Sequence, residues 1–254
     1  MSSRMAIVLA AGKGTRMKSD LPKVLVPVCG RPIIEYVLDT LKAAGVDRIV
    51  VVIGYRADLV RLTLAERSGI EFAEQTEQLG TGHAVMMCRP QLKTHDGLVL
   101  VVTGDSPLVQ RESVETLVRE FDQRKPGCLL GTIHKDQPQG LGRIVRDAQG
   151  CFQAIVEERD ATAEQKKITE VNMSTYVFES RDLLSALDQI KPNNAQGEYY
   201  LTDCPRMLLD AGRPVDALPV LKPIESLSIN TPDELLVVED AMRQMVSIEG
   251  KAAK

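Results

Sequence analysis

The sequence is poor in aromatic residues: of 254 residues, 4% are aromatic and none is tryptophan. Proteins that bind single-stranded nucleic acids stack the bases on aromatic side chains, so this class is disfavoured. The net charge of −4 gives no basic surface of the kind that nucleic acids require. We therefore expect no nucleic-acid partner.

Long apolar runs and paired cysteines are absent too. No stretch approaches the roughly 18 apolar residues that cross a bilayer, and the first residues lack the apolar core of a signal peptide. The five cysteines are odd in number and far apart: Cys29, Cys88, Cys128, Cys151 and Cys204. The three histidines lack zinc-site spacing: His83, His95 and His134. We expect a cytoplasmic protein without a membrane partner, whose cysteines are reduced and mostly serve packing.

The sequence contains apolar strands that alternate with amphipathic helices. The strands are expected at residues 6–9, 48–53, 70–74, 98–103, 128–133, 140–144, 152–158, 170–178 and 215–220. The helices are expected at residues 32–44, 57–67, 112–124, 181–190 and 232–246, with two more beginning near residues 81 and 202. This order predicts an α/β fold, Rossmann-like, with a mostly parallel central sheet and helices on both faces. We expect one domain over residues 1–247, divided near residue 125 where short strands begin to replace the alternation, and a frayed tail at 248–254.

A glycine-rich loop with several cations follows the first strand. Gly12 and Gly14 lie in it, and its cations are Lys13, Arg16, Lys18 and Lys23. Strand, glycine-rich loop and helix form a phosphate site in α/β proteins, because free N–H groups and cations meet the anion there. Met17 stands where the dinucleotide-binding fingerprint needs its third glycine, and the P-loop spacing is absent, so neither of these motifs applies.

Further polar groups follow other strands at the same edge of the predicted sheet. Gln75 could pair with the edge of a planar base, and the turn at Gly80–Gly82 exposes N–H groups at a helix start. Asp105 directly follows a buried strand, where a carboxylate suits Mg²⁺; the alternative is that it caps the next helix. His83 is expected to be a packing or hydrogen-bonding residue rather than a base.

The second half offers candidates for a hydroxyl-rich ligand. Glu157 and Asn172 could pair with sugar hydroxyls, or could be solvated strand residues. Thr202 is a sensible N-cap for the helix that follows it. Thr231 and Glu234 form a capping box, and Asn230 just before it could share a cation with Asp105.

Eight blocks of the sequence, in this order, resemble the N-acetylglucosamine-1-phosphate uridylyltransferases. This family forms the first half of a bifunctional bacterial uridylyltransferase/acetyltransferase and belongs to the nucleoside-diphosphate-sugar pyrophosphorylases. The matching blocks are Leu9–Met17, Leu21–Val24, Glu77–Ala84, Gly104–Leu108, Gly142–Ile144, Ile155–Glu157, Glu170–Asn172 and Asn193–Asp203. The resemblance implies an enzyme that uses Mg²⁺, UTP and a sugar 1-phosphate, with a nucleotide-binding half over about residues 1–125 and a sugar-binding half over about residues 126–230.

The resemblance also implies which residues do the work. Arg16 and Lys23 would be catalytic and bind phosphates, and Asp105 and Asn230 would hold Mg²⁺. The nucleotide would contact Leu9, Ala10, Ala11, Gly12, Gly14, Thr15, Gln75, Gln78, Gly80, Thr81 and Gly104. The sugar would contact Gly142, Glu157, Asn172, Tyr199 and Thr202, under a small mixed β extension.

Three departures from the family pattern bear on the sugar and the metal. Leu141 stands where an aromatic residue is usual, Met173-Ser174 replace Thr-Gly, and Ser228 and Thr231 flank Asn230 where Gly and Asn are usual. If strand alternation holds, Met173 points away from the pocket and Ser174 shares the pocket face with Asn172. The sequence contains no hexapeptide repeats, so we expect no acetyltransfer from it.

Several alternatives stay open at this stage. The chain could use another sugar 1-phosphate, such as glucose 1-phosphate, or another nucleotide, and it could be a non-catalytic sugar-nucleotide sensor. A dehydrogenase is a weaker alternative because of Met17. The number of metal ions, the oligomeric state (including a homo-oligomer) and a separate acetyltransferase partner are likewise open.

Overall fold

A computed structural model describes residues 3–252 of the chain, and side chains as far as residue 245. Its strands are β1 (Ser3–Ala10), β2 (Pro27–Val28), β3 (Arg31–Pro32), β4 (Arg48–Ile53), β5 (Ile70–Glu74), β6 (Gly97–Thr103), β7 (Cys128–His134), β8 (Gly142–Arg146), β9 (Phe152–Val156), β10 (Glu170–Glu179) and β11 (Val215–Leu218). Its α-helices are α1 (Ile33–Ala43), α2 (Ala57–Thr63), α3 (Thr81–Met86), α4 (Arg89–Lys93), α5 (Arg111–Arg124), α6 (Ser180–Leu187), α7 (Cys204–Asp210) and α8 (Pro232–Ala252).

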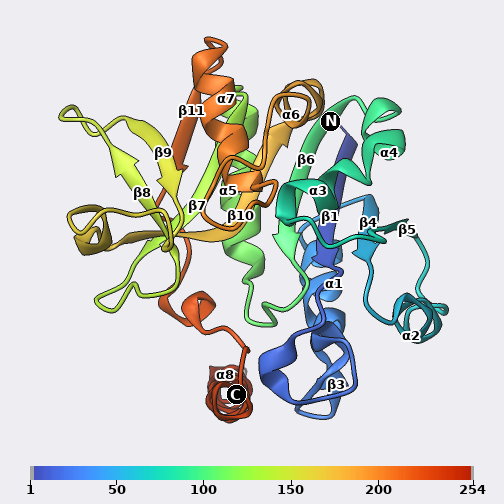
Figure 1. Ribbon diagram of the computed structural model, residues 1–254. Coiled ribbons are helices and arrows are strands. Elements are labelled where there is room, and N and C mark those ends of the chain that lie inside the picture. The colour runs from blue at the N-terminus through green and yellow to red at the C-terminus, as the bar shows by residue number, and fades with distance from the viewer. Residues whose placement is uncertain (1–2, 253–254) are drawn as a thin grey trace.

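Nine of the strands form one twisted sheet (Figure 1): seven follow the order β11-β7-β10-β6-β1-β4-β5, and β8 and β9 join it beside β10. β1 pairs in parallel with both β4 and β6, and β4 with β5. β10 is antiparallel to its neighbours β6 and β7, and β11 is parallel to β7. The predicted, mostly parallel α/β sheet is therefore confirmed, with β10 as its antiparallel member.

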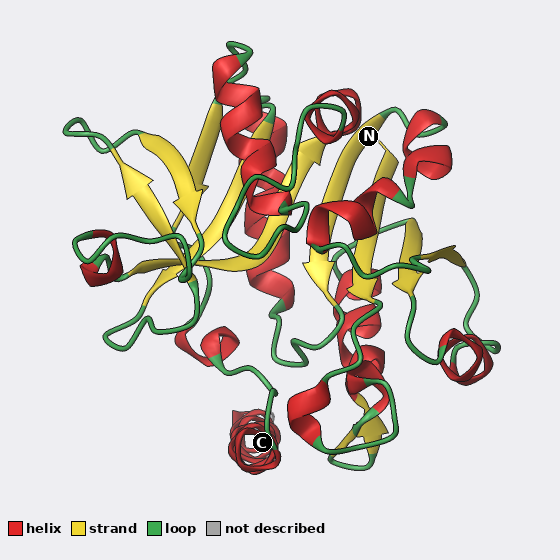
Figure 2. Cartoon of the chain, in the orientation of Figure 1, coloured by secondary structure: helices red, strands yellow, loops and turns green. Residues whose placement is uncertain are grey.

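Apolar residues cover both faces of this sheet, which explains why its central strands are continuous apolar runs. One core lies under α1, α2 and α5 and includes Leu38, Val60 and Leu117. The other lies under α3, α4, α6 and α7 and includes Val85 and Leu208. Figure 2 shows the helices on the two sides of the strands, with α8 apart from the sheet.

The predicted extension exists as a short antiparallel arrangement. β8 pairs with β9 and, through Gly142 and Arg143, with β10. A two-residue hairpin of β2 and β3 forms a second, separate sheet. Helix α8 packs beside this hairpin, where Val238 and Ile229 are buried against Val28. Figure 1 shows α8 and the hairpin beyond the edge at which β1 and β6 end.

Some predicted boundaries were wrong. Helix α2 ends at Thr63 instead of Arg67, and the helix expected from Thr81 is two short ones, since Pro90 begins a new turn at α4. Helix α8 continues to Ala252, so residues 248–252 of the tail that was expected to be frayed are helical; Ala253 and Lys254 lie outside the described residues. Over residues 3–252, none of the helices has the length and apolar character needed to cross a membrane.

Candidate active site

The glycine-rich loop folds back over Lys23. Gly14 has a left-handed backbone with φ of +67°, and a Cβ atom there would lie 2.6 Å from the Cβ of Lys23. A side chain at this position would therefore push the loop away. The next residues form the single 3₁₀ turn η1 (Thr15–Met17), from which Arg16 extends.

The Lys23 ammonium lies between two oxygens from distant segments. Its Nζ is 2.6 Å from Asp105 Oδ2 and 2.8 Å from Asn230 Oδ1. A nitrogen of the Arg16 guanidinium donates to the same Asn230 oxygen at 3.0 Å. The alternative that Asp105 caps α5 is wrong, because Gln110 occupies the N-cap and Asp105 pairs with Lys23. The four residues predicted for phosphate and metal thus lie together.

Asn230 is fixed by the start of helix α8. Its backbone N–H donates to Glu234 Oε2 at 2.6 Å, and its side-chain nitrogen donates to Ser228 Oγ at 3.0 Å. The predicted capping box is confirmed: Glu234 N donates to Thr231 Oγ1, and Thr231 N donates to Glu234 Oε2. These contacts hold Asn230 so that its side-chain Oδ1 faces Lys23 and Arg16.

A cavity of about 330 Å³ opens beside this cluster, at the carboxyl ends of β1 and β6. It is lined by Leu9, Ala11, Gly12, Gln75, Gln78, Gly80, Thr81, Ala84, Thr103, Asp105 and Glu198. Ala10 is instead buried in the core under α1. Gly104 donates its N–H to Leu9 O at 2.8 Å, and a Cβ atom there would lie 3.1 Å from the same oxygen, so a glycine lets the loop bearing Asp105 pass close to β1.

Gln75 is buried in the cavity wall with its amide in a fixed orientation. Its Nε2 lies 3.1 Å from Gly80 O and 3.1 Å from His83 Nδ1. His83 is therefore a hydrogen-bonding residue, as expected. Thr81 does not cap α3; it is the helix's first residue, and its Oγ1 accepts the N–H of Leu201 at 3.1 Å.

Four of the five residues predicted for the sugar gather at the β8–β9–β10 end. A Cβ atom at Gly142 would lie 3.6 Å from Asn172 Cβ and 3.6 Å from Glu157 Oε1. Thr202 Oγ1 donates to Glu157 Oε1 at 3.0 Å. The N-cap predicted for Thr202 is wrong: it lies in the 3₁₀ turn η4 (Leu201–Asp203) ahead of α7, and its hydroxyl serves Glu157 instead.

A bulge in β10 fixes the Asn172 side chain. The pairing of β10 with β7 shifts register between Asn172 and Thr175, and Ser174 has a left-handed φ of +53°. Asn172 Nδ2 donates to the buried Tyr176 hydroxyl at 2.7 Å, and Asn172 Oδ1 accepts the Ser174 N–H at 3.1 Å. The regular alternation of side chains along β10 therefore breaks at Ser174. The expectation that Ser174 faces the pocket together with Asn172 depended on this alternation and loses its basis. Met173 does point away, into the core beneath α5.

The β8–β9–β10 end is acidic, in contrast to the loop of cations. Burial raises the pKa of Glu157, and the nearby charges of Asp160, Asp203 and Glu198 raise it further against the Thr202 hydrogen bond. Burial likewise raises the pKa of Asp203. The site therefore has two ends of different charge. The end with Arg16 and Lys23 suits anions, and the end with Glu157 suits uncharged hydroxyl groups.

Tyr199 lies elsewhere than expected. Its backbone oxygen accepts the Gly82 N–H at 2.7 Å, and its ring centroid is 6.3 Å from that of His83, so it packs beside the start of α3 and is not among the residues that line the cavity. Its neighbour Tyr200 is the one near the acidic end, where burial and the charges of Asp160 and Glu157 raise its pKa.

Sequence reasoning missed Tyr176 and Glu198. Glu198 lies in the block Asn193–Asp203 that carried the family resemblance, but nothing in its residue type indicated that it lines the cavity. Tyr176 follows Asn172 by four residues in a strand, a spacing that brings side chains together only because of the bulge.

The α/β sheet, the cationic loop after its first strand and the acidic group after a neighbouring strand describe a nucleotidyltransferase. Residues 6–201 match the family model of the MobA-like NTP transferase domain, and the chain belongs to this family. It is 42% identical over 248 residues to the bifunctional protein GlmU of Listeria welshimeri, covering 97% of this chain and 54% of that protein. The bifunctional protein GlmU of Halalkalibacterium halodurans is 42% identical over 247 residues, with the same coverage. The chain spans about half the length of these curated relatives.

Proposed function

We propose that the protein transfers a uridylyl group from UTP to N-acetylglucosamine 1-phosphate, giving UDP-N-acetylglucosamine and pyrophosphate in the cytoplasm. The observation that carries this proposal is the cluster of Lys23, Arg16, Asp105 and Asn230, of which Asp105 also lines the cavity of about 330 Å³. The sugar 1-phosphate oxygen would attack the α-phosphorus of UTP in line, and pyrophosphate would leave. Such a transfer depends on positioning and charge neutralisation rather than on a protein nucleophile.

The cysteines agree with a direct transfer. Among the described side chains, Cys88, Cys128 and Cys204 are buried, and burial raises the pKa of the Cys88 thiol to about 12. A thiol with such a pKa stays protonated at neutral pH and is a poor nucleophile. The two exposed cysteines, Cys29 and Cys151, are not among the residues that line the cavity.

Gln75 favours uracil as the base. Its two amide N–H groups are taken by Gly80 O and by His83 Nδ1 acting as an acceptor. The carbonyl Oε1 is then the group that can serve a ligand, and it requires a donor. Uracil presents an N–H at N3 that can serve Gln75 Oε1, whereas N3 of cytosine is an acceptor and only the exocyclic amino group of that base could donate.

The residues at the expected metal position fit Mg²⁺. Hard oxygen ligands are what Mg²⁺ takes, usually one or two from the protein with the rest from phosphate and water. Asp105 Oδ2 and Asn230 Oδ1 already share one cation, the Lys23 ammonium, and therefore converge on one point. When bound, Mg²⁺ would neutralise phosphate charge. Arg16 and Lys23 would hold the phosphates of UTP, and Lys23 would also contact the sugar phosphate.

The acidic end favours an uncharged sugar ring. Gly142, Glu157 and Asn172, which lie close together, would offer a bare backbone, a carboxylate and an amide to a ligand. The Met173-Ser174 pair does not narrow this end by side-chain volume, since Met173 packs into the core. N-acetylglucosamine 1-phosphate is therefore the acceptor we prefer, and glucose 1-phosphate is the second candidate because Leu141 replaces the family's aromatic residue.

The test is a product assay with purified protein, several nucleoside triphosphates and a panel of sugar 1-phosphates. We expect the highest kcat/KM for UTP with N-acetylglucosamine 1-phosphate, and dependence on added Mg²⁺. A preference for glucose 1-phosphate would correct the sugar alone. The absence of any nucleotide sugar would leave a sensor as the better proposal.

A further inference from the structure

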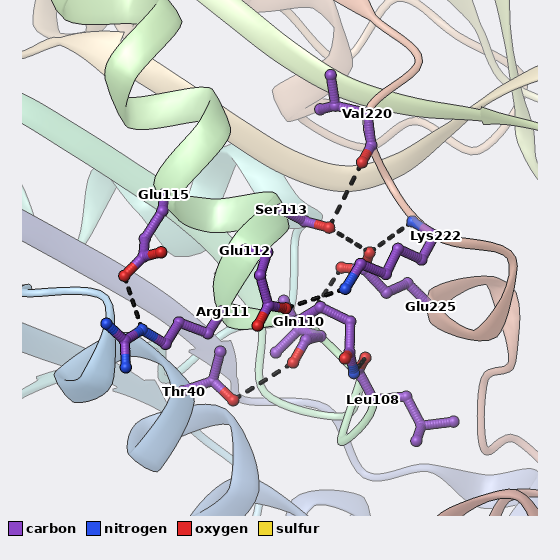
Figure 3. A network of polar contacts seen from close by, with 11 residues as sticks. Thr40, Leu108, Gln110, Arg111, Glu112, Ser113, Glu115, Val220, Lys222 and Glu225 are labelled. Atoms are coloured by element: carbon purple, nitrogen blue, oxygen red, sulfur yellow. Dashed lines mark hydrogen bonds and ion pairs between the residues drawn. The ribbon is translucent and has the colours of Figure 1, made fainter. Parts of the chain in front are cut away.

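Glu225 is a buried carboxylate outside the cavity, on the 3₁₀ turn η5 (Pro223–Ser226). It is 6% exposed, and Figure 3 shows it facing the first turn of α5. Its Oε1 accepts the backbone N–H of Gln110 at 3.0 Å. Its Oε2 accepts the Ser113 hydroxyl at 2.6 Å and the Lys222 backbone N–H at 2.6 Å.

The charge of Glu225 is held by these three uncharged donors and by the start of a 14-residue helix. The Lys222 ammonium points to Glu112 instead, at 3.0 Å. Helix N-termini favour negative charge, but a buried carboxylate that loses a donor retains an uncompensated charge. The distance between η5 and the first turn of α5 is therefore strongly restrained.

These two elements support the two sides of the proposed metal site. Helix α5 begins where the loop that carries Asp105 ends, and Gln110 closes that loop by donating its side-chain N–H to Leu108 O at 2.7 Å. Asn230 follows Glu225 by five residues. Leu108 and Ile229 are buried in the same small core, so the two segments also pack together near the site.

We propose that Glu225 is a positioning residue that sets the spacing between Asp105 and Asn230. It acts through Gln110 and Ser113 on one side and through the Pro223–Ser226 turn on the other. This inference rests on the proposed function in one respect, namely that Asp105 and Asn230 bind the metal together. Glu225 itself touches neither substrate nor metal.

The experiment compares UTP binding in EDTA with UTP binding in excess Mn²⁺, by calorimetry. In the wild type we expect tighter binding with Mn²⁺. Glu225→Gln keeps the volume of the side chain but turns an NH₂ group toward donors, so the two metal-binding loops lose their fixed spacing. We expect this variant to lose at least about tenfold of the Mn²⁺-dependent gain while its affinity in EDTA stays within about twofold.

Two further variants separate positioning from stability. Ser113→Ala removes the hydroxyl that donates to Glu225 and should lose a smaller part of the Mn²⁺-dependent gain in UTP affinity. This variant can still test the inference if Glu225→Gln folds poorly. Glu170→Gln is the matched control: Glu170 is also 6% exposed, but its partners are Arg146 and Thr132, which lie on neither loop. It should lower thermal stability and leave the Mn²⁺-dependent gain intact.

The outcomes are distinct. An unchanged gain in both Glu225→Gln and Ser113→Ala overturns the inference, and so does an equal loss in Glu170→Gln. If Asp105→Asn removes the gain while Glu225→Gln keeps it, the inference fails and the metal site stands. If the wild type shows no gain, the metal assignment and the inference fail together, and the product assay decides the proposed function separately.

Discussion

Lys23 carries its ammonium between two oxygens that come from widely separated segments of the chain. Its side chain is 13% exposed and contacts Asp105 and Asn230 at once. A cation in this place can neutralise phosphate charge in the bound substrates and in the transition state alike. Arg16 adds a second, more exposed cation on the same amide oxygen.

We expect Lys23→Ala to lower kcat/KM by at least 100-fold, which corresponds to about 2.7 kcal/mol of transition-state stabilisation. KM for both substrates should rise and kcat should fall, since the lost charge acts in ground and transition states. Steady-state kinetics with each substrate varied would measure this. The control is Lys13→Ala: the Lys13 ammonium lies 5.2 Å from the centre of the Tyr55 ring, so its loss should change kcat/KM by less than about threefold. Equal effects of the two changes would contradict a special role for Lys23.

Glu157→Gln should stabilise the protein at neutral pH. Burial raises the pKa of Glu157 above 4.5, so the folded state binds its proton more tightly than the unfolded state does. The carboxylate therefore costs stability at pH values above its raised pKa, and this cost disappears as the pH falls below about 4.5. The variant should have the higher free energy of unfolding at pH 7, no advantage near pH 4, and a raised KM for the sugar 1-phosphate.

The neighbouring glutamate gives a control of opposite sign. The hydrogen bond from Arg143 lowers the pKa of Glu158, so its ionised form stabilises the folded state at neutral pH. Glu158→Gln should be less stable than the wild type at pH 7 and lose this difference below the lowered pKa. Urea unfolding of both variants from about pH 2.5 to pH 8 would measure the two trends. The same sign in both would show that the electrostatic account is wrong.

Elements with one dominant signal could be predicted from the sequence. The bounds of β4 and β5 were correct because short, β-branched apolar runs are buried on both faces of a parallel sheet. The capping box at α8 was correct because it is a local hydrogen-bond pattern. Helix α2 was predicted too long because the residues after Thr63, Leu64-Ala65-Glu66-Arg67, are all good helix formers and give no local stop signal.

The missing parts of the candidate site depend on contacts between distant elements. Thr202 looked like an N-cap because its sequence neighbours fit one, yet its hydroxyl donates to Glu157 on another element. The bulge at Ser174 interrupts the regular alternation of side chains along β10. The residues Met173 and Ser174 carry no sequence signal that would have predicted a bulge. Glu225 carries no motif of its own, and its role follows only from the position of α5.

The turn of the β2–β3 hairpin leads to a prediction about the stability of a single structural element. Its two-residue turn consists of Cys29 and Gly30, both with positive φ (+47° and +81°), and turns of this type favour Asn-Gly. Cys29→Asn should raise the free energy of unfolding by on the order of 0.5 kcal/mol, because asparagine tolerates the left-handed conformation better. The Cys29 N–H would keep its bond to Glu239 Oε1. The control is Cys151→Asn at the other exposed cysteine, where φ is not positive and no increase in the free energy of unfolding is expected. Thermal unfolding of both variants would measure the difference.

At the scale of the whole molecule, the two halves of the chain, before and after about residue 125, share one sheet. β10 belongs to the second half of the chain and inserts between β6 of the first half and β7 of the second. The core under α1 and α5 likewise combines Val51 and Leu100 with Leu129 and Val177. Burying apolar surface from both halves together makes their separate unfolding costly. We therefore expect residues 1–247 to behave as one domain with one cooperative unfolding transition.

Leu129→Ala tests this expectation, because Leu129 is fully buried on β7 in the second half. The cavity it leaves should cost about 2–5 kcal/mol of unfolding free energy. If the molecule unfolds as one unit, native-state hydrogen exchange should show the same loss of protection in β4, which lies across the sheet in the first half, as in β7. Leu62→Ala, at a side chain that is 74% exposed on α2, should leave both strands unchanged. Loss of protection in β7 with full protection retained in β4 would mean that the halves unfold separately, and that the site between them forms from two units rather than one.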